Sequence, residues 1–179
     1  MLLYASCAAT ETEVDWSPDF TQIWTDKEDS ISKFKSDLQD YTKRALKKLN
    51  YRGKYEYIMC ISDKENFRKL VLPTYKSNRT KRKPCGYKFL KEWVQENYRC
   101  EQRRLLEADD LIGILSGTIE NCCILSADKD MLTLPGQFYH FLKDEFYDTT
   151  ESEATYNRFY QTLKAILQIA TMDYLDVVM

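Results

Sequence analysis

Short apolar segments alternate with amphipathic segments along most of this chain, and that alternation limits the folds open to it. Residues 55–61 and 122–126 are short and mostly apolar, which is typical of buried strands. Residues 30–50 carry apolar side chains at spacings of three and four, which predicts a helix with a charged outer face. Strands alternating with helices favour an α/β fold with a mainly parallel, twisted sheet flanked by helices.

Turn residues and the spacing of apolar residues also predict the structure of the remaining segments. Residues 10–29 are polar and lack a period, so we expect an irregular segment with a turn at Ser17-Pro18-Asp19. The segment 70–84 contains two prolines and a run of Lys and Arg, which predicts a loop or mobile arch. We expect further helices over 88–98, 105–116 and 152–167, and short strands over 98–102 and 140–142.

Composition excludes several classes of protein. A chain of 179 residues with 44% hydrophobic residues can form one globular domain with a real core. No apolar stretch approaches the roughly 20 residues that span a bilayer, so we expect no membrane partner and a cytoplasmic location. The six cysteines form no CxxC pair, and His140 is the one histidine, so we expect reduced thiols rather than a zinc site.

Charge is distributed unevenly, although the net charge is only −2. Residues 75–88 are strongly basic, whereas Asp and Glu dominate 105–110, 128–130 and 144–153. A cationic stretch suggests phosphate groups as partners, and an anionic cluster suggests metal ions.

Three acidic groups follow predicted strands or begin a predicted helix. Ligands of open α/β sheets gather outside the carboxyl ends of the strands, and oxygen ligands suit Mg²⁺ or Mn²⁺. Each group alone has a structural explanation: a strand end, a turn, or a helix start that favours negative charge. Their occurrence together favours a metal site. The candidate ligands are Asp63, Glu107, Asp109, Asp110, Asp128 and Asp130.

The motifs themselves resemble those of the 5′-3′ exonuclease/flap endonuclease family, which has a PIN-like nuclease core. The order is Asp63 closing a strand, Phe67-Arg68, then Pro73-x-Tyr75-Lys76-x-x-Arg79. Glu107-Ala108-Asp109-Asp110 and Ser126-x-Asp128-x-Asp130 follow with the expected spacing. The nearest resemblance is to small tailed-phage exonucleases, and it covers roughly residues 57–164.

The resemblance implies a Mg²⁺-dependent 5′-3′ exonuclease or flap endonuclease, encoded by a phage or prophage, that hydrolyses DNA at 5′ ends or flaps. Two Mg²⁺ (or Mn²⁺) ions would be held mainly by Glu107, Asp109, Asp128 and Asp130, with Asp63 and Asp110 in support. Lys76 and Arg79 would contact the scissile phosphate. Backbone phosphates would meet Lys81, Arg82 and Lys83, and a terminal base would stack on Tyr75.

Both ends depart from the family pattern. The family's first strand, which ends in Asp-Gly-Asp, and its helix-three-turn-helix region have no counterpart, so we expect a nuclease core over 1–164 and a divergent tail over 165–179. Reading the codons of the tail one base earlier allows Gly-Asp-x-x-Asp, which suggests a single-base frameshift; a genuine divergent helix is the alternative. Two other functions stay open: an inactive remnant that binds nucleic acid through 75–88, and a PIN-type ribonuclease acting on RNA.

Overall fold

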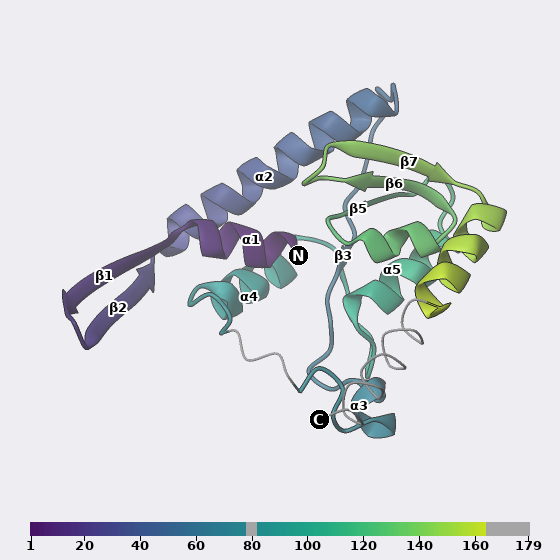
Figure 1. Ribbon diagram of the computed structural model, residues 1–179. Helices are drawn as coiled ribbons and strands as arrows, with labels where there is room; N and C mark the ends of the chain where they lie inside the picture. The colour runs from purple at the N-terminus through teal and green to yellow at the C-terminus, as the bar shows by residue number, and fades with distance from the viewer. Residues whose placement is uncertain (78–81, 164–179) are drawn as a thin grey trace.

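The computed structural model describes residues 1–77 and 82–163 (Figure 1). The chain begins with α1 (Leu2–Ala9), β1 (Glu11–Ser17), β2 (Phe20–Thr25), α2 (Lys27–Lys48), β3 (Met59–Cys60) and α3 (Phe67–Val71). It continues with α4 (Tyr87–Asn97), β4 (Cys100–Glu101), α5 (Ala108–Ser116), β5 (Cys123–Ser126), the 3₁₀ helix η1 (Lys129–Thr133), β6 (Gly136–His140) and β7 (Glu145–Thr149). Residues 151–163 are helical. The end of the predicted last helix, the predicted tail over 165–179, Arg79 and Lys81 all lie outside the described residues.

The long helix α2 confirms the period-based prediction for residues 30–50. Asp26 caps its N-terminus by accepting hydrogen bonds from the amides of Glu28 and Asp29, at 2.7 and 3.1 Å. Acidic residues in the first turn and lysines in the last complement the helix dipole. Its apolar stripe buries Phe34 and Leu38 in the main core, whose other buried members are Cys7, Leu90 and Val94.

The strands form three small sheets rather than one. β3 pairs in parallel with β4, and β5 pairs in parallel with β6, which pairs antiparallel with β7. The α/β class and the parallel pairs agree with the prediction, but β3 and β5 lie in separate sheets within the described ranges, so no single parallel sheet spans the chain. The predicted strand over 55–61 is reduced to Met59–Cys60, because β4 supplies hydrogen bonds over just that length.

The N-terminal hairpin corrects the prediction that residues 10–29 are irregular. β1 and β2 pair antiparallel around the predicted turn at Ser17-Pro18-Asp19 and project from the body (Figure 1). Trp16, Phe20 and Trp24 are exposed on this hairpin. Val14 and Trp16 alternate with polar residues in β1, but the apolar residues of β2 do not alternate with polar ones, so the segment as a whole carries a weak strand signal.

The later strands differ from the prediction in extent. The strand expected over 140–142 spans Gly136–His140, and Leu142 is exposed in the turn before β7. Phe138 and Tyr139 on β6 are fully buried.

Helix α5 packs against both β3 and β5. Its N-terminus therefore lies beside the segments that follow these two strands, where the acidic motifs occur. No helix in the described ranges is long and apolar enough to cross a membrane. All six cysteines are free thiols, and of these only Cys7 is buried.

Candidate metal and phosphate site

Asp63, directly after β3, anchors the loop that leads into α5. Its Oδ2 accepts a hydrogen bond from the Leu105 amide at 2.8 Å, and its Oδ1 accepts from the Lys64 amide at 2.8 Å and from Gln102 Nε2 at 3.1 Å. The two amide bonds lower the pKa of Asp63. Leu105 has a left-handed backbone with φ +66°, which the bond to Asp63 helps to hold. Asp63 thus supports the loop through its own carboxylate.

Glu107 and Asp110 form a capping box at the start of α5. The Glu107 amide donates to Asp110 Oδ2 at 2.9 Å, which satisfies one of the free amides of the first turn. The sequence placed these two side chains on one face of the helix, and the structure confirms it. Asp109 lies between them in sequence, and the charges of Asp128 and Glu107 both act on its carboxyl group.

Three donors surround the Glu107 carboxylate. Lys76 Nζ lies 2.5 Å from Oε1, while the Tyr75 hydroxyl donates to Oε2 at 3.0 Å and Arg68 Nη1 lies 3.3 Å from the same oxygen. Partial burial alone would raise the pKa of Glu107, but the bonds from Lys76 and Tyr75, with the charges of Lys76 and Arg68, lower it. Lys76 has a left-handed backbone with φ +58°, a strain of about 1–3 kcal/mol that is typical of functional sites.

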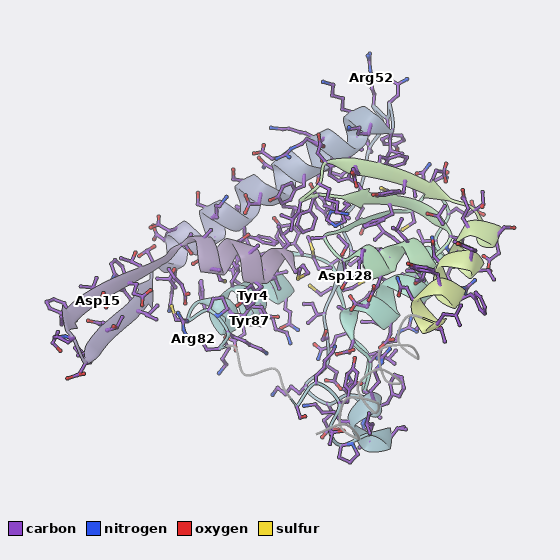
Figure 2. The ribbon with its side chains drawn as sticks, viewed as in Figure 1. Tyr4, Asp15, Arg52, Arg82, Tyr87 and Asp128 are labelled. Carbon is purple, nitrogen blue, oxygen red and sulfur yellow. The ribbon has the colours of Figure 1, made fainter. Side chains whose placement is uncertain are left out.

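The second acidic motif begins η1. The Asp128 amide donates to Ser126 Oγ at 3.1 Å, and Asp128 Oδ1 in turn accepts from the Asp130 amide at 3.0 Å. Asp128 is half-buried near the centre of the molecule (Figure 2), whereas Asp130 is exposed. The α-amino group of Met1 also lies within the electrostatic range of Asp128 and of Asp109.

Asp109 connects the two motifs electrostatically. Partial desolvation raises its pKa first, and the negative charges of Asp128 and Glu107 raise it further. Among the described residues, neither Asp109 nor Asp128 has a Lys or Arg ion-pair partner. The charges of Lys76 and of the Met1 α-amino group oppose this rise in the pKa of Asp109 but do not cancel it. Carboxylates that still repel one another are the donor set that a hard divalent cation neutralises.

The donor chemistry therefore fits Mg²⁺ or Mn²⁺, although the ligands are not gathered into one cluster. Within residues 1–77 and 82–163, no three Asp, Glu, His or Cys side chains lie close enough to hold an ion together. Of the six predicted ligands, the structure brings Asp109 within charge range of both Asp128 and Glu107. The Asp63 carboxylate already accepts a hydrogen bond from a backbone amide, and the Asp110 carboxylate accepts hydrogen bonds from a backbone amide and from Arg68.

The predicted nucleic-acid contacts divide into two groups. Tyr75 and Lys76 lie at Glu107, with Lys76 Nζ 4.8 Å from the centre of the Tyr75 ring. Arg82 lies instead near the base of the hairpin, in a different part of the molecule from Asp128 (Figure 2). Lys83 stacks over the Tyr87 ring at 5.1 Å.

Arg82 is held by Glu11, the first residue of β1. Its Nη1 and Nη2 donate to the two Glu11 oxygens at 2.7 and 3.0 Å, and the Cys85 amide also donates to Glu11 at 2.7 Å. The Arg82 hydrogen bonds are the main cause that lowers the pKa of Glu11 to about 2. The pair ties the basic segment to the hairpin.

We predict that Arg82→Gln raises the Glu11 pKa from about 2 toward about 4.3, the ordinary Glu value. Because the folded pKa is depressed, the pair stabilises the fold above about pH 4.3, and this contribution is lost as the pH falls toward 2. Carboxyl-detected NMR titration of both proteins measures the shift, with Arg99→Gln, from an exposed ion pair with Glu56, as the control. An unchanged Glu11 midpoint in Arg82→Gln would contradict the pairing.

Arg68 is the site residue whose role sequence reasoning missed. The Phe67-Arg68 pair belongs to the family motif, but its residue types alone assign no role to Arg68. Its two oxygen contacts on Asp110, at 2.8 and 2.6 Å, join positions 42 residues apart. Clustered carboxylates need a counter-charge, but Lys76 and Arg79 in the same motifs were equally available, so the sequence did not single out Arg68.

Comparisons with known proteins agree with these motifs. A family model described as the 5′-3′ exonuclease, N-terminal resolvase-like domain, matches residues 37–164. The exonuclease of Escherichia phage T7 and the exodeoxyribonuclease of Enterobacteria phage T3 are each 27% identical over 173 residues. That alignment covers 91% of this chain and 56% of each phage protein, so the chain spans little more than half the length of these curated relatives. No solved structure matches the chain significantly.

Proposed function

Because the chain belongs to the 5′-3′ exonuclease family through its N-terminal resolvase-like domain, we propose that it is a Mg²⁺- or Mn²⁺-dependent nuclease that hydrolyses DNA phosphodiesters at free 5′ ends or flaps. The observation that carries the proposal is the contact of Lys76 with Glu107 beside the mutually repelling Asp109 and Asp128. A phosphodiester needs cations on its oxygens and carboxylates to hold metal ions, and this arrangement offers both. In a phage-encoded setting the protein would act in the cytoplasm of the host cell.

In this proposal, Glu107, Asp109, Asp128 and Asp130 hold two ions, directly or through water. When bound, the ions supply activation of a water molecule and stabilisation of the departing 3′-oxygen. Asp63 holds the loop before α5, and so keeps Glu107 and Asp109 beside the segment that contains Asp128.

Lys76 and Arg79 act on the scissile phosphate in this proposal. Lys76 is already within reach of the carboxylates, and a cation there offsets the negative charge that develops in the transition state. Tyr75, next in sequence, offers a ring on which a terminal base can stack. Contacts to the DNA backbone without sequence reading are assigned to Lys81, Arg82 and Lys83.

The test is cleavage of a linear DNA duplex labelled at its 5′ end in the presence of Mg²⁺. We expect early release of the 5′ label, no release after chelation by EDTA, and no attack on a covalently closed circular duplex, which has no 5′ end. Salt-sensitive binding without cleavage would instead support the nucleic-acid-binding remnant. Faster cleavage of structured RNA than of DNA would support the ribonuclease.

Removal of one basic side chain should weaken DNA binding in a salt-dependent way. For Lys83→Ala we expect the slope of log K against log salt concentration to fall by roughly 1, as for one lost phosphate contact. Fluorescence anisotropy with Ca²⁺ in place of Mg²⁺ measures binding without cleavage. Lys143→Ala, an exposed residue between β6 and β7, is the matched control and should leave the slope unchanged. Equal slopes for the wild type and Lys83→Ala would remove Lys83 from the interface.

A further inference from the structure

Arg68 joins the two acidic residues that begin α5. It lies on α3, which Asn66 caps by accepting the Arg68 amide at 2.8 Å. The guanidinium donates to both oxygens of Asp110, at 2.8 and 2.6 Å, and its Nη1 also reaches Glu107 Oε2 at 3.3 Å. A planar fork on a carboxylate is the geometry in which arginine binds most strongly and with most directional control.

The guanidinium of Arg68 also lies over two aromatic rings. The centre of the guanidinium lies 4.7 Å from the Phe67 ring and 6.0 Å from the Tyr75 ring. Tyr75 also donates to Glu107. One third of the Arg68 side chain is exposed, so the rest is held among these contacts. Arg68 is thus fixed by its surroundings before any ligand is bound.

The carboxylate of Asp110 is fully engaged. Its Oδ1 accepts from Arg68 Nη2, and its Oδ2 accepts from both Arg68 Nη1 and the Glu107 amide. An oxygen pair that caps a helix and binds a guanidinium has little capacity left for a metal ion. Glu107 differs, because its partners include Lys76 and Tyr75, which come from the segment assigned to phosphate and base.

We propose that Arg68 is a positioning residue of the site, which holds Asp110 as the cap of α5 and thereby sets the position of the Glu107 carboxylate. Its kinetic part rests on the proposed nuclease function. Asp110 then serves the helix rather than an ion, and Arg68 acts on Glu107 through Asp110 and through its own 3.3 Å contact, without touching the phosphate.

Hydrogen exchange of the Glu107 amide tests this proposal without metal or DNA. Arg68→Lys keeps the charge but loses the fork, and Arg68→Met loses both while keeping the length. We expect both variants to exchange the Glu107 amide roughly 2- to 10-fold faster than the wild type, because the Asp110 acceptor is no longer held. Arg158→Lys, from the exposed pair with Glu151, is the control and should leave the rate unchanged.

Metal titration and kinetics supply the remaining readouts. In Arg68→Lys we expect the Mn²⁺ affinity to fall roughly 10- to 100-fold, as when the support of a ligand is lost. We also expect kcat to fall while KM for DNA stays unchanged. The double variant Arg68→Met with Asp110→Asn should be no worse than the more damaging single variant, since both act through one contact.

The outcomes separate this inference from the proposed function. If the wild type cleaves no DNA but the Arg68 variants exchange the Glu107 amide faster than it does, the nuclease function is overturned and the positioning role stays intact. Unchanged exchange in Arg68→Lys would overturn the positioning role, whatever the activity. Full rescue of kcat by lysine, or a raised KM with kcat preserved, would also overturn it, because Arg68 would then act as a charge on the DNA.

Discussion

Asp128→Asn is expected to remove the proposed divalent-ion binding and, with it, the proposed Mg²⁺-dependent cleavage of DNA. The substitution keeps the shape of the side chain and an oxygen for the Asp130 amide, so η1 should still form. It removes the charge that acts on Asp109. We expect Mn²⁺ affinity to fall by at least about 100-fold, because even residues that only support metal ligands cost roughly 10- to 100-fold. We expect cleavage to fall by at least about 10²- to 10³-fold, as when one group that stabilises the transition-state charge is lost.

A second readout of this variant needs neither metal nor DNA. The Asp128 charge raises the pKa of Asp109, so Asp128→Asn should make the Asp109 carboxyl titrate at lower pH. Asp148→Asn, at an exposed position on β7, is the matched control for both readouts. Unchanged Mn²⁺ binding together with an unchanged Asp109 titration would mean that the two carboxylates share no site.

Phe34→Ala is expected to destabilise the fold by about 3–5 kcal/mol, the usual cost of emptying a large aromatic site in a core. Phe34 is 1% exposed and packs edge-on against Trp93 and Tyr98, with ring centroids 6.4 and 5.8 Å away. It joins α2 to α4 and to the segment before β4. At roughly 2–4 °C per kcal/mol for a chain of this size, Tm should fall by about 6–20 °C.

Urea and thermal unfolding followed by far-UV circular dichroism measure this change. Phe20→Ala on the exposed hairpin is the matched control, and it should cost less than about 0.5 kcal/mol, as is usual for surface positions. A Phe34→Ala protein as stable as the control would mean that the core does not pack through α2.

Sequence periodicity was sufficient to predict an element that buries one of its faces. Helix α2 was predicted because Phe34, Leu38 and Ala45 recur on one side and are buried on that side. No residue of the hairpin is buried, and the apolar residues of β2 do not alternate with polar ones, so the hairpin was missed although Val14 and Trp16 alternate in β1. The division into separate sheets was not predicted either, since which strands pair depends on contacts between distant segments.

The candidate site was predictable in its local part. The spacing of Glu107 and Asp110 predicted a shared helix face, and the capping box confirms it. Their partner Arg68 could not be deduced, because its contacts span 39 and 42 residues and depend on how α3 is placed beside α5. Asp109 and Asp110 are neighbours in one motif, but only Asp110 is bound by a guanidinium. We therefore expect the two carboxylates to have different roles.

The projecting hairpin has a consequence for the route by which a polyanion can reach the basic residues. It carries the carboxylates of Glu11, Glu13, Asp15 and Asp19 and no Lys or Arg, and Arg82 neutralises only the first of them. In the proposed nuclease, the negative charge of this ribbon would repel the phosphates of DNA that approached from its side. The repulsion would act only at short range, because at physiological ionic strength it fades over about 8 Å.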